Sequence, residues 1–191
     1  MKKIFTLLSV VALGTFANAQ IVINEVYGGG GNSGATLKND FIELINRGTS
    51  SVTLTGASLQ YASNSGTFNQ YHTLPSITLE PNQTYLIQES TGSGGTVNLP
   101  TPDYVAPQLT NFDGSTNSSI GFSMSASNGK IVLASDAVQV TGPTASNVVD
   151  FVGYGTATTY EGTAAAPAPS AANSISRTNG VDTNVNSADF T

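Results

Sequence analysis

The sequence has 191 residues, with twelve acidic side chains against six basic ones and no cysteine. Without cysteine there are no disulfides, no thiol catalysis and no zinc–thiolate site. The acidic excess argues against a nucleic-acid-binding protein, because such proteins depend on Lys and Arg to neutralise phosphates.

The first 19 residues have the pattern of a signal peptide. Lys2 and Lys3 precede an apolar run from Ile4 to Leu13, which is too short to span a membrane. Small residues at Ala17 and Ala19 then form a cleavage site. We therefore expect residues 1–19 to be removed and the protein to be exported, that is secreted, periplasmic or held at the cell surface. No later apolar run is long enough for a transmembrane segment.

Short β-prone runs separated by turn residues follow, and none has convincing helical periodicity. This pattern is typical of an all-β sandwich or barrel. The predicted strands lie near Ile21–Tyr27, Asp40–Asn46, Ser51–Leu54, Ala57–Ala62, Ser76–Leu79, Thr84–Gln88, Lys130–Ala134 and Val148–Tyr154. A chain of about 170 residues can bury roughly 70% of its unfolded surface, so we expect one domain over residues 20–191.

A carboxylate interrupts each of the first two predicted strands. Simple alternation of sides places Glu25 on the face of Ile21 and Ile23, and Glu43 on the face of Phe41 and Ile45. The sequence does not indicate which face of either strand packs inward.

The loop between these strands contains Gly29-x-Gly31-x-x-Gly34, a formal match to a dinucleotide-binding motif. That motif works by opening a helix, whereas this loop leads directly into a strand. We therefore interpret it as a mobile connection. His72 is the only histidine, and the chain has no Gly-x-Ser-x-Gly motif, so a structural or surface role is expected for His72 in a partly exposed strand or turn.

Several segments resemble the lamin-tail domain family in its bacterial exported form, and they occur in the family's order. They are Ile23-Asn-Glu-Val-Tyr27, Asn39-Asp-Phe-Ile-Glu-Leu-Ile-Asn-Arg47, Val52–Leu59, Leu74–Ile87, Gly129-Lys-Ile-Val-Leu133, Val148–Gly155, Ser174-Ile-Ser-Arg-Thr178 and Ser187-Ala-Asp-Phe190. The resemblance implies an immunoglobulin-like β-sandwich with mostly antiparallel strands, and a non-catalytic interaction domain. Related chains usually continue past the Asp-Phe motif, which is consistent with a truncated C-terminus here.

Four carboxylates on the predicted strands or their edges are candidate calcium ligands: Glu25, Asp40, Glu43 and Asp150. Calcium takes six to eight oxygen ligands from carboxylates, amides and carbonyls. Two alternatives remain open. Glu25 and Glu43 bond backbone groups or Arg47 at the sheet edge, or they form an acid/base pair. Apart from this possible Ca²⁺, no cofactor is expected.

The sequence predicts a non-enzymatic module for binding, attachment or scaffolding. Its expected partner is a protein, a cell-envelope component or a surface polymer, and not a nucleic acid. The alternative is an exported metal-dependent hydrolase of phosphoesters or glycans, or an accessory domain of one, which would use the four carboxylates around a divalent cation.

Overall fold

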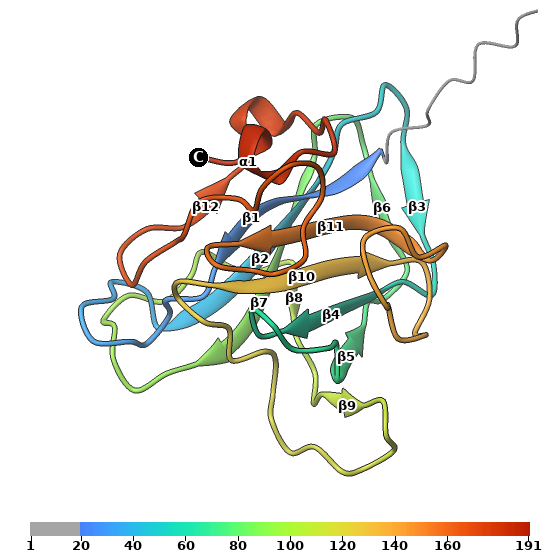
Figure 1. Cartoon of the computed structure of the whole chain (residues 1–191). Helices are drawn as coiled ribbons and strands as arrows, with labels where there is room; N and C mark the ends of the chain where they lie inside the picture. The colour runs from blue at the N-terminus through green and yellow to red at the C-terminus, as the bar shows by residue number, and fades with distance from the viewer. Residues whose placement is uncertain (1–19) are drawn as a thin grey trace, which may run out of the picture.

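The computed structural model describes residues 20–191, so the predicted signal peptide lies outside the described residues. Nearly all regular structure in this part is β-strand (Figure 1). The strands are β1 (Ile21–Tyr27), β2 (Asn39–Asn46), β3 (Val52–Leu54), β4 (Ser58–Ala62), β5 (Gln70–Thr73), β6 (Ile77–Leu79), β7 (Thr84–Thr91), β8 (Tyr104–Val105), β9 (Thr110–Asn111), β10 (Gly129–Ala134), β11 (Val148–Tyr154) and β12 (Ile175–Ser176). A 3₁₀ turn (Thr178–Gly180) and a single helical turn, α1 (Asn186–Asp189), complete the described chain.

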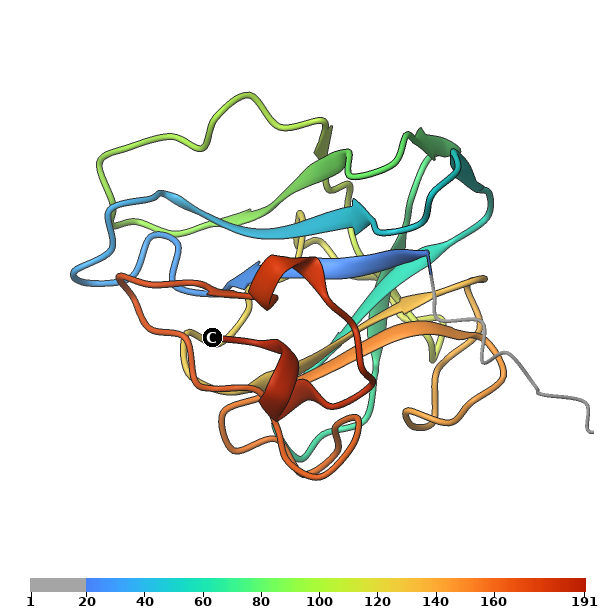
Figure 2. The ribbon, with the colours of Figure 1, turned by 90° about the horizontal axis from the view of Figure 1, so that it is seen from above.

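Two five-stranded sheets form the layers of a sandwich. The first sheet has the order β12-β1-β2-β7-β8, and the second has the order β11-β10-β4-β5-β9. Only the β7–β8 pairing is parallel among the ladders of these strands, and β3 and β6 form a separate antiparallel pair. Figure 2 shows the two layers, with the red C-terminal segment (residues 173–191) across one open side. The predicted all-β sandwich with mostly antiparallel strands is confirmed.

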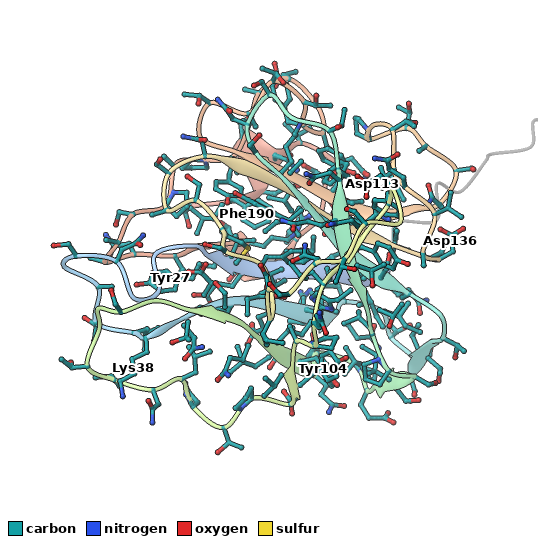
Figure 3. The ribbon with its side chains drawn as sticks, turned by 90° about the horizontal axis from the view of Figure 1, so that it is seen from below. Tyr27, Lys38, Tyr104, Asp113, Asp136 and Phe190 are labelled. Atoms are coloured by element: carbon teal, nitrogen blue, oxygen red, sulfur yellow. The ribbon has the colours of Figure 1, made fainter. Side chains whose placement is uncertain are left out.

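The core lies between the two sheets, because alternate residues of each central strand point inward. Ile42 and Leu44 of β2 face Ile131 and Leu133 of β10 within one apolar cluster, and all four are fully buried. Phe190 from the C-terminal segment belongs to the same cluster and lies among the interior side chains in Figure 3. The core face of β2 is therefore that of Ile42, and Glu43 points away from it.

The eight predicted strands are present, with shifts of a few residues at some ends. The prediction missed β5, β8, β9 and β12. Three of these contain only two residues, too few to show a period, and β5 is polar. The alanine- and proline-containing run at residues 164–172 contains no helix.

A bulge in β1 corrects the predicted orientation of Glu25. The pairing register with β2 shifts between Ile23 and Glu25. Ile21, Ile23 and then Val26 lie in the core, while Glu25 is half-buried. A bulge adds one residue to a strand and so reverses the alternation of sides beyond it. Glu25 therefore does not share the face of Ile21 and Ile23.

The glycine-rich loop is closely packed, which corrects its interpretation as a mobile connection. Its residues Gly28–Gly31 are buried. A Cβ added at Gly30 would lie 2.0 Å from the backbone carbon of Asn39, and one added at Gly31 would lie 2.2 Å from Gly92. The glycines thus permit close approach of backbones. No helix begins in this loop, as expected for a segment without nucleotide-binding geometry.

Among the described residues, neither helical segment has the length or apolar character of a membrane-spanning helix.

Candidate functional site

The predicted pair of glutamates is brought together by the fold. Glu25 and Glu43 lie opposite each other across β1 and β2, and both are half-buried. The Ser174 hydroxyl donates to Glu25, and the Asn24 amide donates to Glu43 over 2.7 Å. Within residues 20–191, Arg47 does not bond either glutamate, so the partners differ from those predicted. Calcium binding by this pair stays a prediction.

Asp40 lies at the start of β2 and is buried. Its two oxygens accept hydrogen bonds from the backbone N–H groups of Gly30 and Met124, each at 2.8 Å. Burial raises the pKa of Asp40 to about 7, against the lowering effect of these N–H donors, and the charge of Glu89 adds to the rise. Asp40 thereby fastens the glycine-rich loop to the segment that precedes β10.

Asp150 on β11 is bound by a buried arginine. Arg177 donates to both carboxylate oxygens, at 2.7 and 2.9 Å. The backbone N–H groups of Ile23 and Phe151 also donate to this carboxylate, at 2.6 and 2.9 Å. Each oxygen therefore accepts two hydrogen bonds. Burial raises the pKa of Asp150, and the charge of Arg177 opposes this rise.

The other hydrogen bonds of the Arg177 guanidinium go to the C-terminal segment and to β1. It donates to Asp189 at 2.9 Å, to Asp182 at 3.1 Å and to the carbonyl of Ile23 at 2.8 Å. Its guanidinium carbon lies 4.6 Å from the centre of the Phe190 ring, within the range of a cation–π contact. Burial opposes the charged form, but the surrounding carboxylates keep the Arg177 pKa raised.

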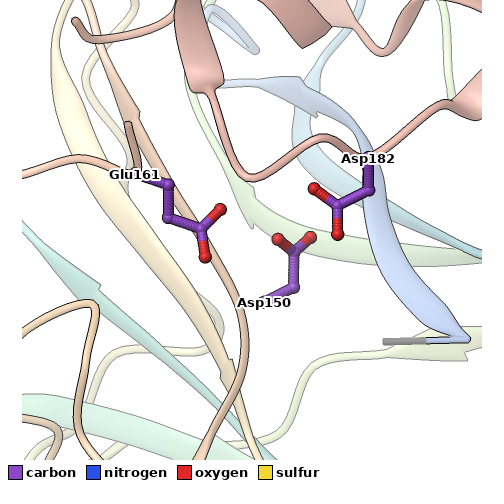
Figure 4. Close-up of side chains that lie close together, drawn as sticks. All are labelled: Asp150, Glu161 and Asp182. Atoms are coloured by element: carbon purple, nitrogen blue, oxygen red, sulfur yellow. The ribbon is translucent and has the colours of Figure 1, made fainter. Parts of the chain in front are cut away.

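Beside Arg177, three carboxylates come close enough to share a cation. Oxygens of Asp150, Glu161 and Asp182 lie within 4.8 Å of one another (Figure 4). Burial and the charges of Asp150 and Asp182 raise the pKa of Glu161 to about 8. Glu161 therefore carries a proton at neutral pH, which reduces the repulsion within the group. A divalent cation would have to displace this proton and compete with Arg177 for Asp150.

Only Asp150, of the four predicted calcium ligands, belongs to this group of three. It is the one such group of metal-ligating side chains found in the part of the chain that the structure describes. Sequence reasoning missed Glu161, Asp182 and Arg177 as members of the site. Arg177 lies within one of the family-like motifs, Ser174–Thr178, which marked the segment without indicating its partners. Nothing in the sequence marks Glu161, which lies in a loop.

His72 is buried, contrary to the partly exposed position expected for it. It lies on β5, and its Nε2 is 2.9 Å from Glu89 Oε1 on β7. The other Glu89 oxygen accepts the backbone N–H of Phe122 at 2.8 Å. The Nδ1 atom of His72 has no hydrogen-bond partner among the described residues. This pair connects the two sheets from inside, which agrees with the structural role predicted for His72.

A pocket with a volume of about 410 Å³ opens on the outer face of the second sheet. We call it the Lys130 pocket. Its floor is formed by β10 and β11, and its walls by loops within residues 65–68, 139–142 and 158–159. This volume lies in the range usual for small-molecule sites. Its lining consists of Ser65, Gly66, Thr67, Phe68, Lys130, Gln139, Val140, Thr141, Gly142, Phe151, Thr158 and Thr159.

A family model described as Lamin Tail Domain matches residues 15–156 of the chain. No curated protein matches it. Among solved structures, a DUF4876 family protein from Bacteroides thetaiotaomicron VPI-5482 is similar, with a TM-score of 0.60 and 14% sequence identity. The match covers 91% of this chain and 70% of that one. At this identity the likeness extends to the fold alone.

Proposed function

We propose, from the premise that the chain belongs to the Lamin Tail Domain family with its immunoglobulin-like fold, that it is an exported, non-catalytic binding module. Its partner is a protein, a cell-envelope component or a surface polymer. The Lys130 pocket is the place on the described surface where we expect such a partner to be held.

The composition of the Lys130 pocket carries this proposal. Its lining contains hydroxyl, amide, aromatic and ammonium groups but no Asp, Glu or His. It therefore lacks the paired acid and base that hydrolysis of a glycan or an ester requires. The buried carboxylates lie elsewhere and are bonded to backbone N–H groups or to Arg177. The separation of the pocket from the buried carboxylates favours binding over catalysis.

Retention of the purified full chain on cell-envelope fractions and immobilised surface polysaccharides tests the proposal. Gly142→Leu is the matched variant, because a Cβ at Gly142 meets no atom within 4 Å and the new side chain extends from the pocket wall. We expect the original chain to be retained and the variant to be retained less. No retention on any fraction would refute attachment to the cell envelope or its polysaccharides.

The alternative function, metal-dependent hydrolysis of a phosphoester or glycan, is supported by the group of Asp150, Glu161 and Asp182. Its weakness is that both Asp150 oxygens already accept two hydrogen bonds each. A hydrolase would release product from model phosphoesters or glycans with Ca²⁺ or Mg²⁺, and would lose this activity with a chelator and in Glu161→Gln. Thermal unfolding with and without the chelator separates a purely stabilising cation from a catalytic one.

A further inference from the structure

We propose that the Lys130 pocket binds a sugar that bears a carboxylate, and that the Lys130 ammonium is the partner of this carboxylate. The inference rests on the proposed binding function and adds to it the chemical class of the ligand.

Lys130 is a buried cation that has no carboxylate partner among the described residues. It lies on β10, where its side chain is on the face opposite the core residue Ile131, and only 4% of the residue is exposed. Its Nζ donates to the carbonyl of Gly66 and lies 5.9 Å from the centre of the Phe68 ring. Among the ion pairs of residues 20–191, none involves Lys130.

The described residues use only part of the hydrogen-bonding capacity of the Lys130 ammonium group. An ammonium has three donors, and one protein carbonyl accepts from this one. Burial without a counter-ion disfavours the charged form, and it lowers the pKa of Lys130. None of the described residues that line the pocket is acidic, so a ligand that enters it could supply the negative charge that Lys130 lacks there. An anion in the pocket would accept the free N–H donors.

The pocket walls are held in place by hydrogen bonds between the loops. The backbone N–H of Thr158 donates to the carbonyl of Asn64 at 2.9 Å, and the Gln139 amide donates to the carbonyl of Phe68. The side chain of buried Gln60 on β4 donates to the carbonyl of Val138 at 2.8 Å. Its Oε1 accepts a hydrogen bond from the backbone N–H of Val140 at 2.9 Å. A ligand would therefore meet a largely preformed site, which reduces the entropy lost on binding.

The remaining lining groups fit a hydroxylated ring. Four threonines and one serine supply hydroxyls that both donate and accept, as sugar hydroxyls do. Phe68 and Phe151 pack edge to face beneath these groups, with ring centres 5.6 Å apart, and their 4% and 0% exposure makes them the apolar support of the pocket floor. Binding sites of this kind combine apolar walls with a few convergent polar groups. The composition favours a sugar over a purely aliphatic anion.

A carboxylate fits the charge of this site better than a phosphate. Lys130 contributes one positive charge, and it is the only ionisable residue in the lining. A phosphate monoester carries close to two negative charges at neutral pH. The second charge would be unbalanced in a protein whose formal net charge is already −6. We therefore take a singly charged acidic sugar as the ligand class.

Nuclear magnetic resonance of the lysine side chains tests the proposal in the full chain. The sequence has four lysines, Lys2, Lys3, Lys38 and Lys130, so the Lys130 Cε–Nζ resonances are assigned by their loss in Lys130→Met. We expect D-glucuronate to shift these resonances saturably and D-glucose to do so much more weakly. No saturable shift with D-glucuronate would overturn the proposal.

Two variants control for charge and for folding. Lys130→Met keeps an unbranched stem over Phe68, and we expect isothermal titration calorimetry to show D-glucuronate binding weakened about tenfold or more in this variant, as for a lost charged hydrogen bond. Lys38→Met makes the same change in net charge at a distant place, and we expect no effect. Figure 3 shows Lys38 at the opposite end of the molecule from Asp136, which lies in the loop that forms one pocket wall. Equal weakening in both variants would overturn a role for the pocket.

Separate outcomes distinguish this inference from the proposed function. Acetate and inorganic phosphate serve as competing anions in the same titration. If they shift Lys130 as strongly as D-glucuronate does, the site responds to any anion and the sugar assignment is wrong. If envelope retention is unchanged in Lys130→Met, the binding module stands and the ligand assignment fails. If the full chain is not retained at all while D-glucuronate still binds, the proposed attachment fails and the pocket assignment stands.

Discussion

At the scale of single residues, Arg177 connects parts of the chain that are distant in sequence. Its guanidinium bonds Asp150 on the second sheet, the carbonyl of Ile23 on the first sheet, and Asp189 at the end of α1. The side chain is fully buried. A buried ion pair of this kind adds little stability over an apolar replacement, but removing one partner leaves an uncompensated charge. Arg177 therefore makes the correct docking of three segments interdependent.

We predict that Arg177→Met lowers the free energy of unfolding by about 3–5 kcal/mol, because it leaves Asp150 and Asp189 buried without their counter-ion. Urea unfolding followed by circular dichroism measures the change. The control is Arg47→Met, which removes the only other arginine. Arg47 bonds Asn82 at an exposed position, so its loss should change stability by less than about 0.5 kcal/mol. Similar effects of the two variants would contradict the role given to Arg177.

Two carboxyl groups make stability depend on pH in an unusual direction. Burial raises the pKa of Glu161 to about 8 and that of Asp40 to about 7. The ordinary values in an unfolded chain are about 4. Between about pH 4 and pH 8, the folded state therefore binds more protons than the unfolded state. The free energy of unfolding falls as pH rises through this range. Stability present near pH 4 is lost as pH passes through 7 and 8.

We predict that Glu161→Gln makes the free energy of unfolding depend less on pH between 5 and 8. A glutamine keeps the shape and cannot release a proton, so the variant gains stability relative to the original chain as pH rises. Urea midpoints at pH 5, 6.5 and 8 measure this slope. Glu80→Gln, at an exposed position, is the control and should leave the slope unchanged. An unaltered slope in Glu161→Gln would mean that Glu161 is ionised throughout.

At the scale of elements, the sequence predicted the long strands because their apolar residues alternate over enough positions to define a period. It could not predict the bulge in β1, since the extra residue is specified by pairing with β2 and not by the strand itself. Nor could it predict the partners of Arg177. Asp150 lies 27 residues away in sequence, and no local pattern joins the two. The carboxylates were recognised as unusual, but their contacts are a property of the tertiary fold.

The glycine-rich loop gives a prediction at this scale. Gly30→Ala should lower the free energy of unfolding by about 1–3 kcal/mol, because its Cβ would overlap the backbone of Asn39 at the start of β2. Gly142→Ala is the matched control, since its Cβ meets no atom within 4 Å, and should change stability by less than about 0.5 kcal/mol. Thermal unfolding of both variants provides the comparison. A neutral Gly30→Ala would restore the interpretation of a mobile loop.

At the scale of the whole molecule, the C-terminal segment (residues 173–191) takes part in both layers. Its strand β12 pairs with β1 at the edge of the first sheet. Ile175 and Phe190 belong to the main core cluster, and Arg177 reaches Asp150 on the second sheet. The Lamin Tail Domain match ends at residue 156, yet the contacts of the later segment are those of an integral part of the sandwich.

We predict that a chain ended after Ala172 does not unfold cooperatively. Truncation removes two core side chains, leaves Asp150 without Arg177, and exposes the edge of the apolar strand β1, which is then free to pair with other chains. Circular dichroism during heating and light scattering measure the loss of a sharp transition and the onset of aggregation. Full-length Arg177→Met separates the contribution of the ion pair from that of the packing, because it keeps β12 and Phe190.

A peptide of residues 173–191 added to the truncated chain should restore the transition if the segment acts by docking. A sharp transition in the truncated chain alone would instead place the stability of the sandwich within residues 20–172, and Arg177 would then hold only the C-terminal segment itself.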